Sequence, residues 1–219
     1  MNDRSRALLE ISVIYLVTAI VGSAVYWGST GDVILRFFIA DLAMTLVIYG
    51  VSVIKRNSST YDAYWSIIPF YFILTFLVLN QGDGWNWTQW GVALMVSAWS
   101  WRLTFNWARS WPGWVHEDWR YVMFRGQFKR GFEIMNFFGI HLYPTLAVFL
   151  GCWPLFAVYD PTQQLSWLHG VGLLVGFVGI GFEYVADNEL VAFRTADGRK
   201  REDVLDTGIW AYSRNPNYL

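Results

Sequence analysis

The stretch "ALLEISVIYLVTAIVGSAVYW", residues 7–27, sets the class of the fold. Apart from Glu10 it carries no charge, and a helix that crosses a membrane needs about 20 mostly apolar residues. The preceding "MNDRSR" and the internal "GSA" resemble parts of a signal peptide. The apolar run is longer than the 7–15 or so residues of an ordinary signal-peptide core. We therefore predict a retained first transmembrane helix.

The composition of the whole chain supports a membrane protein. Of its 219 residues 55 % are hydrophobic and only 15 % charged, against about 25 % charged in a soluble domain. Trp, which gathers at membrane interfaces, occurs 14 times. The net charge of −1 argues against nucleic acid as a partner, and one Cys with three His in no ligand spacing predicts no metal site. We expect a multi-pass protein of a bacterial inner membrane or the endoplasmic reticulum, with the lipid bilayer as its partner.

Six spans follow along the chain. We place them at 9–27, 33–54, 65–80, 87–109, 134–159 and 166–185. The loops "GSTGD", "QGDGWN" and "DPTQQL" contain no Lys or Arg. The alternate segments hold nearly all of them: Arg4, Arg6, Lys55, Arg56, Arg120, Arg125, Lys129, Arg130, Arg194, Arg199, Lys200, Arg201 and Arg214. Because positive residues favour the cytoplasm, this predicts an all-α bundle, one domain over 1–219, with both termini cytoplasmic.

Two of these helices carry a polar face at their cytoplasmic ends. In "WRLTFNWAR", Arg102, Asn106 and Arg109 are spaced i, i+4, i+7, which places them on one side of a helix. Glu183 and Asp187 are spaced i, i+4 and, with Arg194, share a face of the sixth span. Charges at a membrane edge pair with each other or line a watered cavity. We favour a cytoplasm-facing polar cavity between the two helices over interfacial ion pairs alone.

Three further features need an interpretation. Gly172 and Gly176 form a small-xxx-small pair of the kind that lets membrane helices pack closely. The loop containing "HEDWRY", residues 116–121, reads alternatively as a surface helix on anionic lipid, which the acidic pair Glu117 and Asp118 opposes. The closing "YSRNPNYL", residues 212–219, is interpreted as a binding turn because Pro216 excludes a regular helix; the alternative is a disordered tail.

The order and spacing of "YDAYWSIIP", "WRL…N..R", "HEDWRY", "GFEYVADNELVAFR" and "YSRNPNYL" resemble the steroid 5α-reductase-like superfamily over residues 61–219. The closest resemblance is to its branch long catalogued as a membrane domain of unknown function. The resemblance implies NADPH bound from the cytoplasm and hydride transfer to the carbon–carbon double bond of an apolar, steroid-like or lipid enone.

The resemblance also carries cofactor contacts over to Glu183, Asp187 and Arg194, and to the closing motif at Tyr212, Arg214, Asn217 and Tyr218. Glu183 departs from the amide that steroid-reducing members tend to have. Arginine suits phosphate because it binds it bidentately. The remaining candidates for the cofactor site are therefore Arg102, Asn106, Arg109, Asp118 and Arg120. The proton donor is one of Tyr64, Tyr121, His141 and Tyr143, and the sequence does not choose among them.

Two other functions compete with the reductase. The string "RNPNY" also resembles the end of S-adenosylmethionine-dependent isoprenylcysteine carboxyl methyltransferases, and a non-catalytic lipid-binding protein is the third reading. Related sequences continue past the closing motif with another apolar helix. We accordingly expect residues 1–219 to lack a C-terminal helix, to fold into six helices and to have little or no reductase activity.

Overall fold

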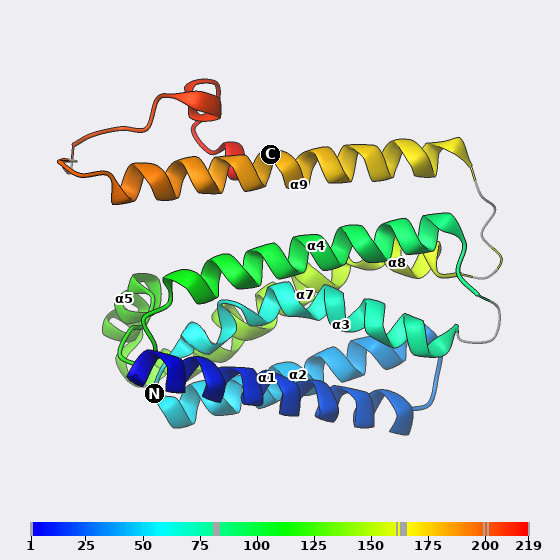
Figure 1. Ribbon diagram of the computed structural model, residues 1–219. Helices are drawn as coiled ribbons and strands as arrows, with labels where there is room; N and C mark the ends of the chain where they lie inside the picture. Colours follow the sequence, from blue (N-terminus) through cyan, green and yellow to red (C-terminus); the bar gives the residue numbers. More distant parts are fainter. Residues whose placement is uncertain are drawn as a thin grey trace.

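The computed structural model describes residues 2–80, 84–160, 162, 166–198, 200 and 202–218, and there it contains helices and no strand (Figure 1). Parts of two of the Lys/Arg-free loops (81–83, 161 and 163–165) and Arg199, Arg201 and Leu219 lie outside these residues. The α-helices are α1 (Asp3–Gly28), α2 (Val33–Lys55), α3 (Tyr64–Leu79), α4 (Trp87–Ser110), α5 (Trp119–Phe128), α6 (Phe132–Met135), α7 (Tyr143–Gly151), α8 (Trp153–Val158) and α9 (Trp167–Thr195). Shorter turns are η1 (Ser58–Tyr61), η2 (Lys129–Gly131), the π-helical η3 (Asn136–Leu142), η4 (Gly208–Ala211) and η5 (Pro216–Tyr218).

The all-α membrane architecture is confirmed. Five helical segments are long and apolar enough to cross a bilayer: Asp3–Gly28, Val33–Lys55, Ser58–Leu79, Trp119–Val158 and Trp167–Thr195. The more polar α4 has 24 residues, enough to span, and lies alongside the other helices (Figure 1). The protein is therefore a multi-pass membrane protein.

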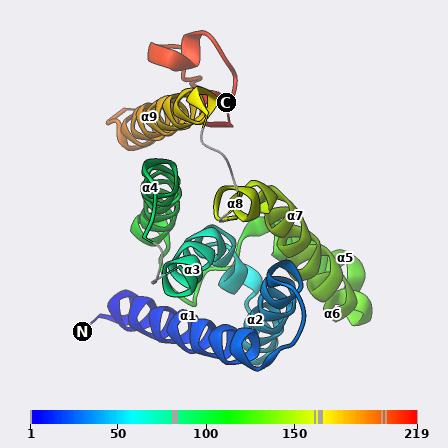
Figure 2. The same cartoon turned by 90° about the vertical axis from the view of Figure 1, so that its right-hand side faces the viewer.

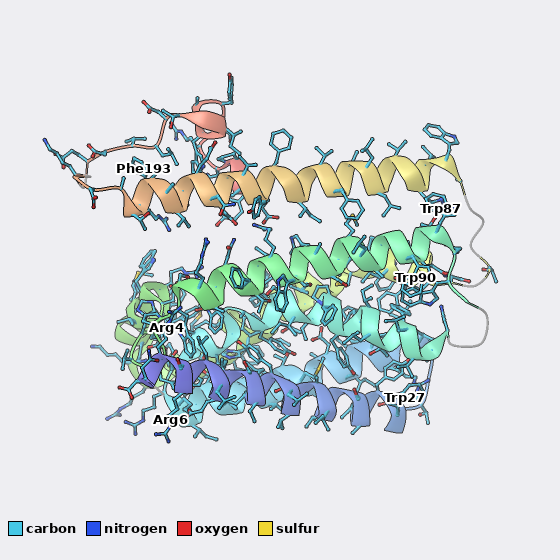
Figure 3. The ribbon with its side chains drawn as sticks, viewed as in Figure 1. Arg4, Arg6, Trp27, Trp87, Trp90 and Phe193 are labelled. Carbon is cyan, nitrogen blue, oxygen red and sulfur yellow. The ribbon has the colours of Figure 1, made fainter. Side chains whose placement is uncertain are left out.

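The spans alternate in direction, so their ends form two groups. The C-terminal ends of α1, α3 and α8 lie at one end of the bundle, near the labelled Trp27, Trp87 and Trp90 (Figure 3). The opposite end of the bundle holds Arg4, Arg6 and the C-terminal ends of α2, α4 and α9 (Figure 3). We call it the basic end; the distribution of Lys and Arg predicts that it faces the cytoplasm.

Side-chain caps set where α4 and α9 begin. The carboxamide oxygen of Asn86 accepts from the backbone N–H groups of Thr88 and Gln89, each at 3.0 Å, and the Gln89 side chain accepts from the Asn86 N–H. Ser166 and His169 form the corresponding reciprocal cap of α9. Such caps satisfy N–H groups that the first helical turn leaves without partners. His169 thus has a structural role.

The fifth span is broken, and its prolines explain the breaks. Pro144 lacks an N–H, and its ring crowds the carbonyl of Ile140, so the regular helix widens into the π-helix η3 just before it. Pro154 follows the second break, at Cys152. The span consequently runs through α6, η3, α7 and α8 as one bent rod.

The packed core lies among α1, α2, α3, α7 and α8. Phe37 is fully buried, and the rings of Tyr26, Phe72, Phe76 and Phe156 lie 4.7–5.3 Å from its centroid. By contrast, α9 lies outside α4, remote from α1 and α2 (Figure 2). Helix α9 therefore joins the bundle mainly through α4.

Candidate functional site

The polar faces of α4 and α9 meet at the basic end. The Arg102 guanidinium donates to Asp187 Oδ2 through Nη1 at 2.5 Å and forms an ion pair with Glu183. The Asn106 amide donates to the same Asp187 oxygen at 2.8 Å. The Arg102 side chain is only 8 % exposed, which is tolerable because two carboxylates surround it. The polar faces of α4 and α9 thus lie opposite each other and are joined by direct ion pairs.

The segment after α9 folds back along it. The Trp210 indole donates to the carbonyl of Ala186 at 3.0 Å, and the Ile209 N–H donates to Glu189 Oε2 at 3.1 Å. Asn217, in the 3-10 turn η5, donates to Asp187 Oδ1 at 3.4 Å. The expectation of a turn at Pro216 is confirmed, and the described part of the closing motif packs on α9. We call Arg102, Asn106, Glu183, Asp187 and Asn217 the charge cluster.

The charge cluster retains hydrogen-bonding capacity. Arg102 Nε and Asn217 Oδ1 are both buried and have no hydrogen-bond partner among the described residues. One is a donor and the other an acceptor. Buried polar atoms in native proteins are almost always satisfied, so these two atoms are available to a water molecule or a bound group.

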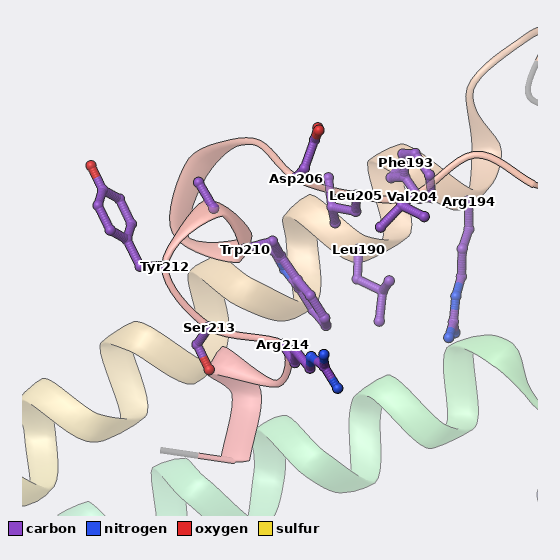
Figure 4. Close-up of a pocket in the computed structure, with 11 residues that line it drawn as sticks. Leu190, Phe193, Arg194, Val204, Leu205, Asp206, Trp210, Tyr212, Ser213 and Arg214 are labelled. Carbon is purple, nitrogen blue, oxygen red and sulfur yellow. The ribbon is translucent and has the colours of Figure 1, made fainter.

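A cavity of about 610 Å³ lies between the last turns of α9 and the returning segment (Figure 4). Its walls include Leu190, Trp210, Asp206 and two arginines, Arg194 and Arg214. Both arginine side chains extend from the upper segments toward the ribbon of α4 (Figure 4). Neither forms an ion pair with a described carboxylate. We call this cavity the arginine pocket.

A second, larger hollow lies between α4 and the helices α3 and α7. Its polar part, about 690 Å³, is lined by Asp62, Arg120, Tyr121 and Tyr143 among others. Its apolar part, about 490 Å³, is bounded by α3, α4, α7, α8 and α9. Trp65 and Val148 line both parts, so we treat them as one membrane cleft.

The membrane cleft and the charge cluster adjoin along the two helices. Trp99 of α4 and Ile180 of α9 line the apolar part of the cleft. Arg102 and Glu183 come three residues later on the same faces, a rise of about 4.5 Å toward the basic end. A molecule in the cleft therefore lies within one helical turn of the charge cluster.

Paired acids and donors line the polar part of the cleft. The Tyr121 hydroxyl donates to Asp62 Oδ1 at 2.7 Å. Arg120 forms two bonds to Asp118, at 2.8 and 3.1 Å. Burial raises the pKa of Asp118, but the hydrogen bonds from the Arg120 side chain and backbone outweigh it, and the net pKa is lowered. Asp118 is therefore ionised and also caps the start of α5.

Comparison with known proteins places this site inside a family. The family described as "Protein of unknown function (DUF1295)" matches residues 48–219, which contain the charge cluster, the arginine pocket and the membrane cleft. This chain belongs to that family. A curated protein similar to this chain is the "Uncharacterized protein C594.04c" of the yeast Schizosaccharomyces pombe, which is 28 % identical over 201 residues, 79 % of this chain and 57 % of the relative. This DUF1295 chain thus spans a little over half the length of that relative, and no solved structure matches it significantly.

The four proton-donor candidates of this DUF1295 protein separate into two pairs. Tyr121 and Tyr143 line the membrane cleft. Tyr64 and His141 are buried in the core instead: Tyr64 lies 3.4 Å from the Thr45 hydroxyl, and His141 Nδ1 lies 2.9 Å from the Asn136 carbonyl oxygen. Neither of the buried two borders the cleft or the arginine pocket.

The cofactor candidates are also divided between locations. Arg102, Asn106, Glu183, Asp187 and Asn217 form the charge cluster, and Arg109 lies beside it, 3.4 Å from Asn106 Oδ1. Arg194, Tyr212 and Arg214 line the arginine pocket, although Tyr212 is 92 % exposed. Asp118 and Arg120 lie at the membrane cleft, and the Tyr218 ring is 84 % exposed. Apart from the exposed Tyr218, the single predicted set is therefore divided among the charge cluster with the adjacent Arg109, the arginine pocket and the membrane cleft.

Two acidic residues, the partly buried Asp62 and the buried Asp41, were not among the predicted site residues. Asp62 lies at the cleft with Tyr121, and Asp41 is buried in the middle of α2, 3.5 Å from the Tyr64 hydroxyl. An isolated acidic residue within an apolar span indicates a functional site, and Asp41 in "FFIADLAMTLV" is such a residue. Asp62, at the edge of a span, gives no such signal; the structure alone shows its contact with Tyr121, 59 positions away.

Proposed function

We propose that this DUF1295 protein is a membrane reductase of the steroid 5α-reductase-like superfamily. In this proposal it binds NADPH at its basic end and reduces the carbon–carbon double bond of an apolar enone. The observation that carries the proposal is the arginine pocket, in which Arg194 and Arg214 have no described carboxylate partner. Arginines without internal partners suit the phosphates of a dinucleotide.

The residues present fit such a cofactor. The pocket of about 610 Å³ lies within the range of about 300–1,000 Å³ typical of ligand sites. Asp206 in its wall suits a ribose hydroxyl, and Trp210 offers a flat apolar surface to a base. The unsatisfied Arg102 Nε and Asn217 Oδ1 supply one further donor and one further acceptor. NADPH supplies a hydride when bound.

The membrane cleft fits the other reactant. Its apolar part accepts a hydrocarbon body, and its polar part, with Tyr121, Asp62 and Arg120, accepts a carbonyl. We assign Tyr121 as the donor to the enone oxygen because Tyr121 lines the cleft. Its hydroxyl donates to Asp62 in the structure and would have to turn from Asp62 to the enone oxygen when the substrate binds. Bound NADPH would supply the hydride for the β-carbon, and the Tyr121 proton on the oxygen would balance it, which gives an enol. The enol would become the saturated ketone as its O–H proton returns to Tyr121 and the α-carbon takes a proton from water.

Nucleotide binding tests the first half of the proposal. We expect Arg194→Ala and Arg214→Ala each to weaken NADPH binding by about 10–150-fold, as the loss of a charge-assisted bond of roughly 1.5–3 kcal/mol requires. Arg6→Ala is the matched control, because Arg6 lies at the same end and pairs with Glu10. Titration calorimetry on the purified chain gives all the values. Equal affinity in the parent and both variants, or binding of S-adenosylmethionine instead, would reject the proposal.

Turnover tests the second half. In a form of the protein that reduces at least one of a panel of steroid-like and long-chain enones, Tyr121→Phe should lower kcat by about 10²–10⁴-fold while NADPH affinity stays unchanged. Tyr64→Phe removes a buried hydroxyl outside the cleft. Provided that this variant folds, its kcat should stay within a few-fold of the parent value. A larger loss in Tyr64→Phe than in Tyr121→Phe would show that the donor is assigned wrongly.

A further inference from the structure

Helix α5 presents an apolar face to the outside of the protein. Trp119, Val122, Met123 and Gly126 are spaced i, i+3, i+4, i+7 and so lie on one side of the helix. Their exposed fractions include 69 % for Trp119 and 53 % for Val122. The opposite side packs inward, with Tyr121 and Phe124 in a cluster with Phe132 and Ile140. Helix α5 is thus amphipathic with its outer face apolar.

The length of the region places α5 at the membrane surface. Residues 119–158 form a 40-residue helical region, about 60 Å if straight, whereas the hydrocarbon layer is about 30 Å thick. The part from α6 to α8 is sufficient to cross. Helix α5 lies at the edge of the bundle, beside α6 (Figure 2). It therefore lies in the interface at the basic end.

The acidic pair near α5 is neutralised internally. Glu117 accepts from the Ser58 N–H and from Arg125, both at 2.8 Å. Asp118 is held by Arg120, as described above. The objection that Glu117 and Asp118 would be repelled by anionic lipid therefore loses its basis, because neither presents an unpaired charge.

Two cations remain directly after α5. Lys129 and Arg130 are exposed and form no ion pair with a described carboxylate. The nearby Glu133 is exposed, but its carboxylate accepts from the Asn136 side chain at 3.0 Å and forms no ion pair with Lys129 or Arg130. Lys129 also has a positive φ of 47°, which ends α5 abruptly and begins a 3-10 turn that holds both basic residues.

We propose that α5 and the Lys129–Arg130 pair form a docking surface for anionic phospholipid headgroups of the cytoplasmic leaflet. The apolar face of α5 contacts acyl chains near the headgroup boundary, and the two cations bind the negatively charged headgroups. This surface is separate from the arginine pocket, and the proposal does not depend on the reductase assignment.

Lipid-specific quenching tests the surface. The protein is labelled with a fluorophore at Gln127→Cys, since the native Cys152 is buried, and reconstituted in mixtures of phosphatidylglycerol and phosphatidylcholine. Quenching by brominated phosphatidylglycerol should exceed quenching by brominated phosphatidylcholine. Each basic residue near an anionic surface strengthens association about fivefold, so Lys129→Gln with Arg130→Gln should lower the preference by up to about 25-fold.

Lys200→Gln is the matched control, because it removes one charge from a different loop at the same end, and it should leave the preference unchanged. In the parent protein alone, raising the salt concentration should also reduce the preference, since screening shortens electrostatic attraction. The proposal is overturned if the parent has no preference, if the preference does not respond to salt, or if the double variant retains it.

Discussion

The bundle of α1 to α3 with α7 and α8 differs from the α4–α9 pair in what holds it together. Nine of the 16 residues of α3 are buried, whereas Ala186 alone is buried among the 29 residues of α9. The first region is held by interdigitated rings around Phe37. The second is held by close helix contact near Met95 and Gly176 and by the charge cluster.

This difference indicates a division of labour between the two regions. Dense apolar packing has few alternative arrangements, so the first region acts as a scaffold. An ion-paired contact between two half-exposed helices can open locally at a much smaller free-energy cost. All three candidate locations, the arginine pocket, the charge cluster and the membrane cleft, border α4, α9 or the segment that returns along α9.

The largest effect is expected from Phe37→Ala. The side chain is fully buried among four other rings, and a Phe→Ala change in a packed core costs about 3–5 kcal/mol. Leu16→Ala is the matched control, because Leu16 is 62 % exposed on α1. Unfolding of the reconstituted protein measures both. Similar losses for the two variants would show that the first region is not the scaffold.

A smaller and more local effect is expected from Arg102→Ala. Removing one partner of a fully buried ion pair costs about 3–5 kcal/mol. Here the Glu183 and Asp187 side chains are 21 % and 19 % exposed, so we expect about 2–3 kcal/mol after solvent screening. Hydrogen exchange should show lost protection in α9 and none in α2. Arg109→Ala, with a single 3.4 Å bond to Asn106, should change little. Loss of protection throughout the bundle would mean that α9 does not open separately.

The smallest effect separates two glycines of α9. A Cβ added at Gly176 overlaps the Met95 sulfur, whereas a Cβ at Gly172 meets nothing within 4 Å. Gly176→Ala should therefore destabilise α9 by about 1 kcal/mol, and Gly172→Ala should stabilise it by about 0.5–1 kcal/mol. Opposite changes in hydrogen exchange of α9 are the expected result, and stabilisation by both substitutions would contradict it. The prediction that both glycines serve helix packing is wrong for Gly172.

The membrane spans were predictable because a bilayer imposes a length and a polarity on each of them. Boundaries differ from prediction mainly where polar residues continue a helix: α1 begins at Asp3, and α9 extends to Thr195. The facing polar sides of α4 and α9 were also predictable, since 3.6 residues per turn places Arg102 with Asn106 and Glu183 with Asp187. A surface helix at α5 was considered only as an alternative, because the acidic pair Glu117 and Asp118 argued against contact with anionic lipid.

By itself, then, the sequence determined that the chain is an α-helical membrane protein, where its spans lie, and which helix faces are polar. Hydropathy and helical periodicity are local properties, and each can be detected within a window of about 20 residues. Only the tertiary structure decided that Tyr121 meets Asp62, that Tyr64 and His141 are buried in the core, and that Glu117 is neutralised by Arg125. Those contacts depend on which helices become neighbours and on the bends at Pro144 and Pro154. Contacts between distant segments are set by packing, which local periodicity does not specify.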